Sequence, residues 1–240
     1  MQKKHLSFLS LSLFALFLSA LLTSCHRGVT LHPSKLTPEV KKECASALSG
    51  LYDTSVRVVS TIAGTERVVK IEDGKRTEYF ESQDSTLQLR TTVLDYDNEM
   101  KMILHGFPLS TLAPALPDSL GELRTAVAAQ SEQELTIDYQ FEYDSYSDQL
   151  FLTFEPQDLP FTCQTADGLQ HHLRLSFRDD SRLLIGTLED RVMNVNLVLD
   201  SRQWSFRAVT LYEDERPLFT FDDWEANDFY TIFMRFDGRS

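Results

Sequence analysis

Side chains that could carry chemistry are scattered through this chain of 240 residues and form no catalytic motif. The sequence contains no GxSxG, HExxH, P-loop or GxGxxG pattern, each of which holds reactive or phosphate-binding groups at a fixed spacing. His171 and His172 are adjacent, but in a strand their rings would point to opposite faces and could not grip one metal ion. We therefore expect no metal and no cofactor, and the sequence names no catalytic residue.

Three short acidic segments deserve comparison with cation sites: residues 95–99, 144–148 and 222–225. Asp95–Glu99 alternates carboxylates as calcium loops do, but it lacks the central Gly and the terminal Glu of an EF-hand. Asp and Asn also favour turns, so we interpret the segments as turns. Two carboxylates about 5 to 9.5 Å apart could hydrolyse a glycoside. With 36 acidic residues some pair will meet that distance by chance, so an enzyme is the less favoured interpretation.

Trp224 is the candidate ligand platform. It lies in the acidic segment Asp222–Asp228, which we expect to be a loop. An aromatic ring beside carboxylates could stack on a sugar or pack against a peptide. The alternative is a Trp that folds back onto the edge of a sheet, because Trp is mostly buried.

Cys44 and Cys163 are the two cysteines available for a disulfide. The alternative is two separate buried thiols that behave as small hydrophobic residues. Sequence alone does not place their Cα atoms within disulfide range, so both alternatives stay open. Neither a CxxC nor a Cys/His cluster with zinc spacing is present.

The third cysteine, Cys25, closes a segment with the layout of a signal peptide. Lys3 and Lys4 are followed by an uncharged run of Leu, Phe, Ala and Ser, shorter than the ~20 apolar residues of a spanning helix. The run ends in Leu22-Thr23-Ser24-Cys25, which resembles the lipobox of bacterial lipoproteins. That resemblance implies a lipid on Cys25 as the first residue of the mature protein. The alternatives are a secretory signal with an incidental Cys and an uncleaved anchor.

The resemblance divides the chain into a signal peptide (1–24), a lipidated Cys with a spacer (25–35) and a globular domain (36–240). The lipid would hold the domain to a membrane. Lipoproteins of the inner membrane often carry Asp after the Cys, whereas this chain has His26 and Arg27. We therefore expect the outer membrane and its periplasmic face, with the cell surface left open. A net charge of −13 repels phosphate backbones, so we expect no nucleic-acid partner.

Two helices are expected in the domain. Thr37 is a suitable N-cap, Pro38 fits the first helical position, and Gly50 supplies a stop. A second helix is expected over Asp118–Gln130, where Ser119 and Glu122 follow the capping-box pattern.

Strands account for most of the rest. Leu135–Tyr143 alternates apolar and polar residues most regularly, and Asp73-Gly74 is a hairpin turn signal. The other strands are expected at Val56–Ile62, Arg67–Ile71, Thr77–Glu81, Leu87–Val93, Met100–His105, Leu150–Phe154, Gln170–Phe177, Arg182–Leu188, Val192–Leu199, Gln203–Tyr212, Pro217–Phe221 and Phe229–Phe236. The pattern predicts an α+β fold, mostly antiparallel meanders with two short helices packed on them. Two similar halves, 36–106 and 107–240, are an open alternative.

LLTSC, a short spacer, the segment TPEVKKECASALSG leading into LYDTSVRVV, and a β-rich body resemble uncharacterised lipoproteins of Bacteroidetes-type bacteria. Such families have no known active site, so the resemblance implies location and fold only. Our first hypothesis is a tethered envelope lipoprotein that binds an unknown protein or glycan, or assists envelope assembly, without catalysis. The alternatives are a carboxylate-dependent hydrolase of envelope or dietary polysaccharide and a periplasmic carrier for apolar ligands.

Overall fold

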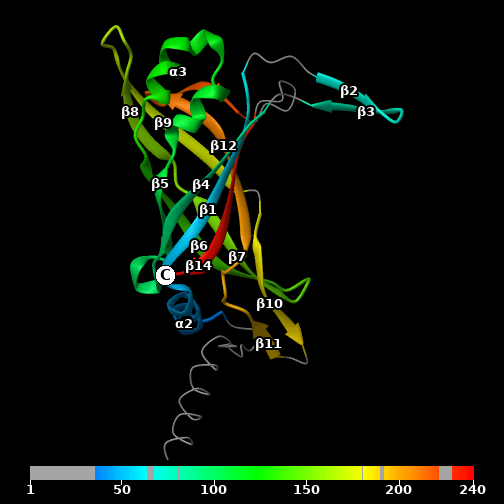
Figure 1. Cartoon of the computed structure of the whole chain (residues 1–240). Helices are drawn as coiled ribbons and strands as arrows, with labels where there is room; N and C mark the ends of the chain where they lie inside the picture. Colours follow the sequence, from blue (N-terminus) through cyan, green and yellow to red (C-terminus); the bar gives the residue numbers. More distant parts are fainter. Residues whose placement is uncertain (1–35, 64–67, 80–81, 180, 190–191, 222–228) are drawn as a thin grey trace, which may run out of the picture.

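The computed structural model describes residues 36–63, 68–79, 82–179, 181–189, 192–221 and 229–240, and Cys25 and Trp224 lie outside these ranges. A curled, half-barrel antiparallel sheet forms the body, with short helices at its two ends (Figure 1). The predicted α+β, mostly antiparallel fold is therefore confirmed. No helix in the described ranges combines the length and apolar character needed to cross a membrane.

The first described helix, α2 (Pro38–Leu48), begins where the sequence predicts. The hydroxyl of its N-cap, Thr37, accepts a hydrogen bond from the Val40 amide at 3.4 Å. Cys44, Ala45 and Leu48 are its buried face and cover one end of the curled sheet. The helix ends at Ser49, and Gly50 already belongs to the first strand.

Within the described ranges, the main sheet contains twelve strands in the order β11-β10-β7-β6-β5-β4-β1-β14-β12-β9-β8, with β13 attached to β12. The strands are β1 (Gly50–Thr61), β4 (Ser82–Val93), β5 (Lys101–Phe107), β6 (Gln133–Asp144), β7 (Gln149–Pro156), β8 (Leu159–Gln164), β9 (Gln170–Asp179), β10 (Leu183–Glu189), β11 (Val192–Val195), β12 (Gln203–Glu213), β13 (Arg216–Thr220) and β14 (Tyr230–Arg239). A separate hairpin pairs β2 (Val68–Glu72) with β3 (Lys75–Tyr79). Its turn is the predicted Asp73-Gly74, and both residues have positive φ.

One bent pair of strands brings the two ends of the curl together. β7 runs into β8 after two residues, and β9 leads on to β10. Leu159 pairs with Leu175 between β8 and β9, while Leu152 pairs with Leu183 between β7 and β10. β7 also pairs with β6, and β9 also pairs with β12, so the bent pair joins opposite flanks of the sheet. β7 and β9 are accordingly in contact.

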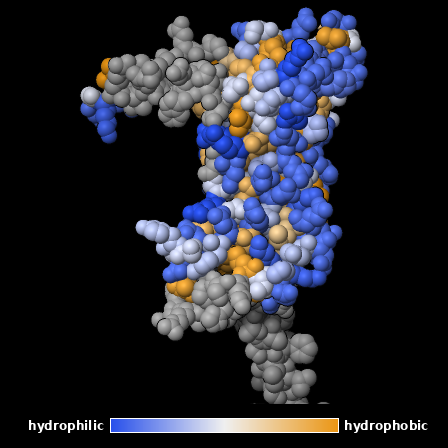
Figure 2. Space-filling model, turned by 180° about the vertical axis from the view of Figure 1, so that it is seen from behind, coloured by the Kyte–Doolittle hydropathy of each residue, from blue (hydrophilic) through white to orange (hydrophobic). Residues whose placement is uncertain are grey.

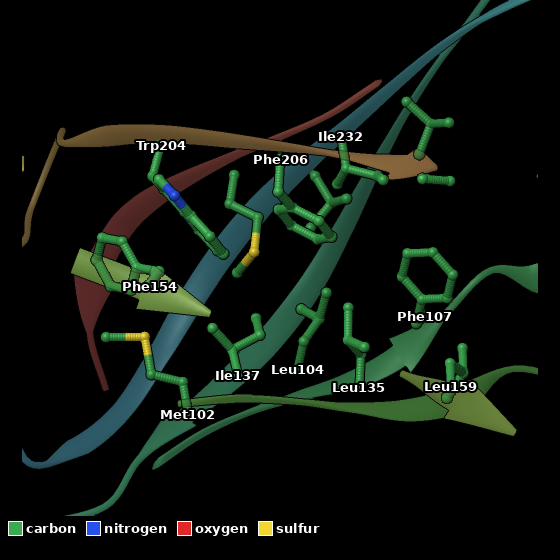
Figure 3. Close-up of a cluster of buried hydrophobic side chains, with 14 of the residues drawn as sticks. Met102, Leu104, Phe107, Leu135, Ile137, Phe154, Leu159, Trp204, Phe206 and Ile232 are labelled. Atoms are coloured by element: carbon green, nitrogen blue, oxygen red, sulfur yellow. The ribbon is translucent and has the colours of Figure 1, made fainter. Parts of the chain in front are cut away.

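The core fills the inside of the curl (Figure 3). Side chains from opposite walls meet there: Trp204 and Phe206 on β12 face Phe154 on β7 and Met102 on β5. The Trp204 ring lies 4.4 Å from Phe154 and 4.8 Å from Phe206, centroid to centroid. Its indole N–H donates to Asp179 at 2.8 Å, which satisfies the polar edge of a buried ring. Both proposed halves, 36–106 and 107–240, contribute to this one sheet and one core.

Short helices close the end of the curl opposite α2. They are η2 (Leu109–Ala115), η3 (Asp118–Leu120) and α3 (Gly121–Ala128), with one further turn, η1 (Tyr96–Asn98), at the α2 end. The predicted capping box is wrong. The Leu120 amide bonds to Pro117 O, so the first turn is a 3₁₀ turn and Ser119 lies inside it. The N-cap of α3 is Leu120, and no side chain caps it.

β8 has no counterpart among the predicted strands. Its segment, Leu159–Gln164, alternates buried and exposed residues, but Pro160 weakens a strand pattern because it cannot donate to a ladder. Pro160 is tolerated because β8 is the last strand of the sheet as far as the chain is described, and its one ladder there is with β9. At β11 the predicted strand is too long. The predicted Val192–Leu199 is a strand only to Val195, because the Asn196 side chain accepts from the Val198 amide and turns the chain.

Candidate functional site

β4 and β5 separate along the side of the curl. They pair from Val93–Met102 to Arg90–His105, and the ladder stops there. β5 then passes through Gly106, whose φ of +83° suits Gly, and Phe107 pairs with β6 after a register shift. Among the strands that the structure describes, only β1 accompanies β4 as it continues to Ser82. We use the name "the split" for the region where β4 and β5 separate. It includes the open edge of β4 at residues 82–89 and the depression described below.

The residues of β4 that direct their main-chain N–H and C=O groups to the open side can be identified from the alternation of hydrogen bonds along a strand. The Leu94 amide donates to Lys101 O, so the main chain of Leu94 points toward β5. Successive residues of a strand bond to alternate sides. Asp84, Thr86 and Gln88 therefore direct their N–H and C=O groups into the split, as Leu94 does toward β5.

The pairing on the other side of β1 leads to the same assignment. The Thr61 amide donates to Phe229 O beside β14, so odd-numbered residues of β1 point to β14 and even-numbered ones to β4. Val56 pairs with Leu87, which makes the odd-numbered residues of β4 the partners of β1. In the described part of the chain, no strand pairs with β4 on the split side beyond Arg90.

A depression of about 530 Å³ lies where the two strands part. Seven residues line it: Asp53, Gln88, Leu89, Arg90, His105, Gly106 and Glu132. Most are polar and lie on the outer face of the sheet. Seen from behind, the surface of the molecule is largely hydrophilic (Figure 2). Leu89 faces the inside of the curl and forms the apolar part of the depression.

The charged groups of the depression are loosely paired. Arg90 Nε lies 3.8 Å from Asp53 Oδ1, and both side chains are more than half exposed. The His105 ring is held at both nitrogens, by Thr92 Oγ1 at 2.8 Å and by Glu134 Oε1 at 2.9 Å. Further along the edge, Arg57 grips Asp84 through both carboxylate oxygens and lowers the pKa of Asp84. The loosest of these pairs, Arg90 with Asp53, therefore leaves a guanidinium and a carboxylate exposed at the rim.

The inner side of the β4 edge is incompletely covered. Val56 and Val58, on the inner face of β1, are buried. Their cross-strand partners, Leu87 and Ser85, are only half-buried. The apolar face of β4 is thus accessible along the split, while the same face one strand away is closed.

The residues singled out from the sequence do not meet at the split. Cys25, with the lipobox, and Trp224 lie outside the described residues. Cys44 and Cys163 are free thiols, each buried at a different end of the curl, Cys44 on α2 and Cys163 on β8. The structure thus contains the two buried thiols and not the disulfide. Burial raises the pKa of Cys44 to about 11 and also raises the pKa of Cys163.

The two histidines lie on opposite faces, as expected from strand geometry. His171 is largely buried, with Nδ1 2.5 Å from Glu213 Oε1, and His172 is exposed. Of the acidic segments, 95–99 forms η1 and its flanking turn, and 144–148 forms the β6–β7 turn. Residues 222–225 lie outside the described ranges. Among the described residues, no three His, Cys, Asp or Glu side chains gather as a metal site would require.

No family model, no curated protein and no solved structure matches this chain. The fold and the split therefore have to be interpreted from their own geometry. Sequence reasoning missed the split, although one signal was present: Gly106 directly follows a predicted strand, where an isolated Gly often marks a bulge or a close backbone approach.

Proposed function

We propose that this chain is a membrane-tethered, non-catalytic binding protein of the bacterial cell envelope, and that it takes its ligand at the split. The observation that carries the proposal is the open edge of β4 in the middle of the sheet order. β1, β6 and β12 are each paired on both sides. Among the central strands of the described structure, β4 has the longest stretch without a neighbour on one side, residues 82–89, and this stretch lies beside a polar depression.

The proposed tether rests on the N-terminal segment that ends in LLTSC at Cys25, and the fold is compatible with a tether at that position. Thr37, which caps α2, is twelve positions after Cys25. α2 lies at one end of the curl and α3 at the other (Figure 1). β4 runs from its Ser82 end near η2 and α3 toward α2 at Val93, so the open part of its edge is directed away from the tethered end. A ligand from the envelope would reach it there without passing the membrane surface.

The hydrolase alternative draws less support from the described carboxyl groups. A general acid needs a carboxyl whose pKa is raised. In the described part of the chain, the carboxyl groups whose pKa departs from the ordinary value all have a lowered pKa, because hydrogen bonds stabilise their charged form. These groups are Glu39, Asp84, Glu99, Asp144, Asp167 and Asp237. An apolar carrier would need space inside the curl, and Trp204, Phe206 and their neighbours fill that volume (Figure 3).

Site-specific photo-crosslinking in the native envelope tests the proposal. A photoreactive residue replaces Gln88 in the split, and the matched control replaces Gln140, an exposed glutamine on the outer face of β6 whose ladder partner is Thr153 of β7. We expect a discrete adduct from position 88 and none from position 140. Equal labelling at the two positions, or no adduct from position 88, would overturn the assignment of the split as the binding site.

A further inference from the structure

We infer that the split binds an extended segment of a partner polypeptide, which adds to β4 as an antiparallel strand and carries apolar and basic residues in alternation. This inference rests on the proposed function and names the class of its ligand. It requires an available main-chain edge, a side-chain pattern beside it, and a reason to favour a foreign segment over a second copy of this chain.

The main-chain edge is long enough for strand addition. An unpaired strand edge presents N–H and C=O groups that an extended chain can complete. β4 offers the groups of Asp84, Thr86 and Gln88 over the eight residues 82–89. The outermost strands are poorer templates, because β11 has 4 residues, and β8, with 6, and β13, with 5, each have a Pro as their second residue, Pro160 and Pro217.

The side chains beside the edge define an alternating pattern. Residues of an added strand would lie across from those of β4 and share their faces. One set would face inward beside the half-buried Leu87 and Leu89, where apolar residues would complete the covering of the core. The other set would face outward beside Thr86 and Gln88, in the surroundings of the polar depression.

The charge of the outer surroundings favours a basic partner. Four carboxylates belong to the depression, its rim or the outer face of β4, namely Asp53, Asp84, Glu132 and Glu134. Asp84 is already paired with Arg57, and Arg90 and His105 are the remaining basic groups. The whole chain carries −13, so it attracts a basic segment and repels a second copy of itself.

Synthetic peptides test the inference directly. The probe is the nine-residue peptide KVKLKVKLK with capped ends, added to the full-length protein purified in detergent, and the control is KKKKKVLVL, which has the same composition and charge. We expect the alternating peptide to bind at least ten-fold more tightly. Two further versions carry N-methyl groups on the odd or on the even residues. Only one set of amides can face β4, so one version should bind and the other should fail. Equal binding of all four peptides would overturn the inference.

Two variants locate the site on β4. Thr86→Pro removes one N–H from the open side and leaves the ladder with β1 intact, whereas Thr86→Val keeps that N–H. We expect Thr86→Pro to weaken KVKLKVKLK binding at least ten-fold and Thr86→Val to bind as the wild type does. If Thr86→Pro fails to fold, hydrogen exchange on the wild type decides. Bound peptide should slow the amides of Asp84, Thr86 and Gln88, and unchanged exchange at all three would overturn the inference.

The remaining outcomes separate this inference from the proposed function. A wild-type dimer that Thr86→Val retains and Thr86→Pro loses would show that a second copy occupies the edge, and would overturn the inference. A glycan or lipid adduct at position 88 would also overturn it, although the split would remain a binding site. An absent adduct together with tight binding of KVKLKVKLK would contradict the proposed function and leave strand addition intact.

Discussion

Arg90 and His105 are the last cross-strand pair between β4 and β5, and the half-barrel opens immediately beyond them. The next residue of β5, Gly106, has a φ of +83°, and a Cβ placed there would lie 3.1 Å from Glu132 Oε2. Bent backbone at one position thus redirects β5 toward β6 and leaves β4 with an open edge.

Gly106→Ala should destabilise the fold by about 1 to 2 kcal/mol, because Ala at positive φ is strained and its Cβ would crowd Glu132. Urea unfolding monitored by circular dichroism measures the change. The control is Gly121→Ala in α3, where a Cβ meets nothing within 4 Å and the helical φ suits Ala. Equal stabilities of the two variants would contradict the role assigned to Gly106.

Leu104→Ala and Leu89→Ala should differ strongly in stability. Leu104 is fully buried in the core, so its truncation should cost about 2 to 5 kcal/mol. Leu89 lies half-buried at the depression, so its truncation should cost only about 1 kcal/mol. Chemical unfolding of both variants provides the comparison, and a larger loss at Leu89 would show that the split is closed in solution.

Cys44 and Cys163 should resist thiol reagents in the folded protein, because both are buried and burial raises their pKa values. An aromatic disulfide reagent at pH 8 should therefore react slowly until denaturant is added. Without reductant, unfolded protein from the native host should then release two thiols if Cys25 is lipidated. Three thiols would contradict lipidation, and none would point to the disulfide.

Cys25→Ala should release the protein from the membrane fraction, because the proposed lipid is the anchor. Circular dichroism should show the same β-rich domain as in the wild type, since the described fold starts well after this position. The measurement is the distribution between membrane and soluble fractions after cell lysis. A variant that stays with the membrane would show that another segment anchors the chain.

Acid should destabilise the fold partly through Asp237. The Ser55 hydroxyl and the Arg235 guanidinium donate to its carboxylate and lower its pKa below the ordinary 3.8. A lowered pKa in the fold adds stability that is fully present above about pH 4 and is lost as the pH falls through the folded value. Asp237→Asn should therefore make stability depend less on pH between pH 4 and 2. An unchanged slope would show that these contacts do not persist in solution.

The sequence predicted local structure well where a local cause exists. The Thr37 N-cap, the Asp73-Gly74 turn and the alternating residues of β6 each act over a few positions, and each is found where expected. The β-strand Leu159–Gln164 was missed because Pro160 weakens the pattern, and only its place at the end of the sheet explains why Pro160 is tolerated.

The candidate site could not be predicted in the same way. The alternation of apolar and polar residues shows which face of a strand is buried, but it does not show which strand lies beside it. The pairing of β1 with β14 joins Val56 to Met234, and the separation of β4 from β5 depends on how far the ladder continues before Gly106. The sequence by itself determined most of the strands, the positions of the two helices and the apolar faces of these elements. The tertiary structure alone decided their order, their curl and the open edge of β4, because pairing between distant segments depends on the closure of the whole sheet.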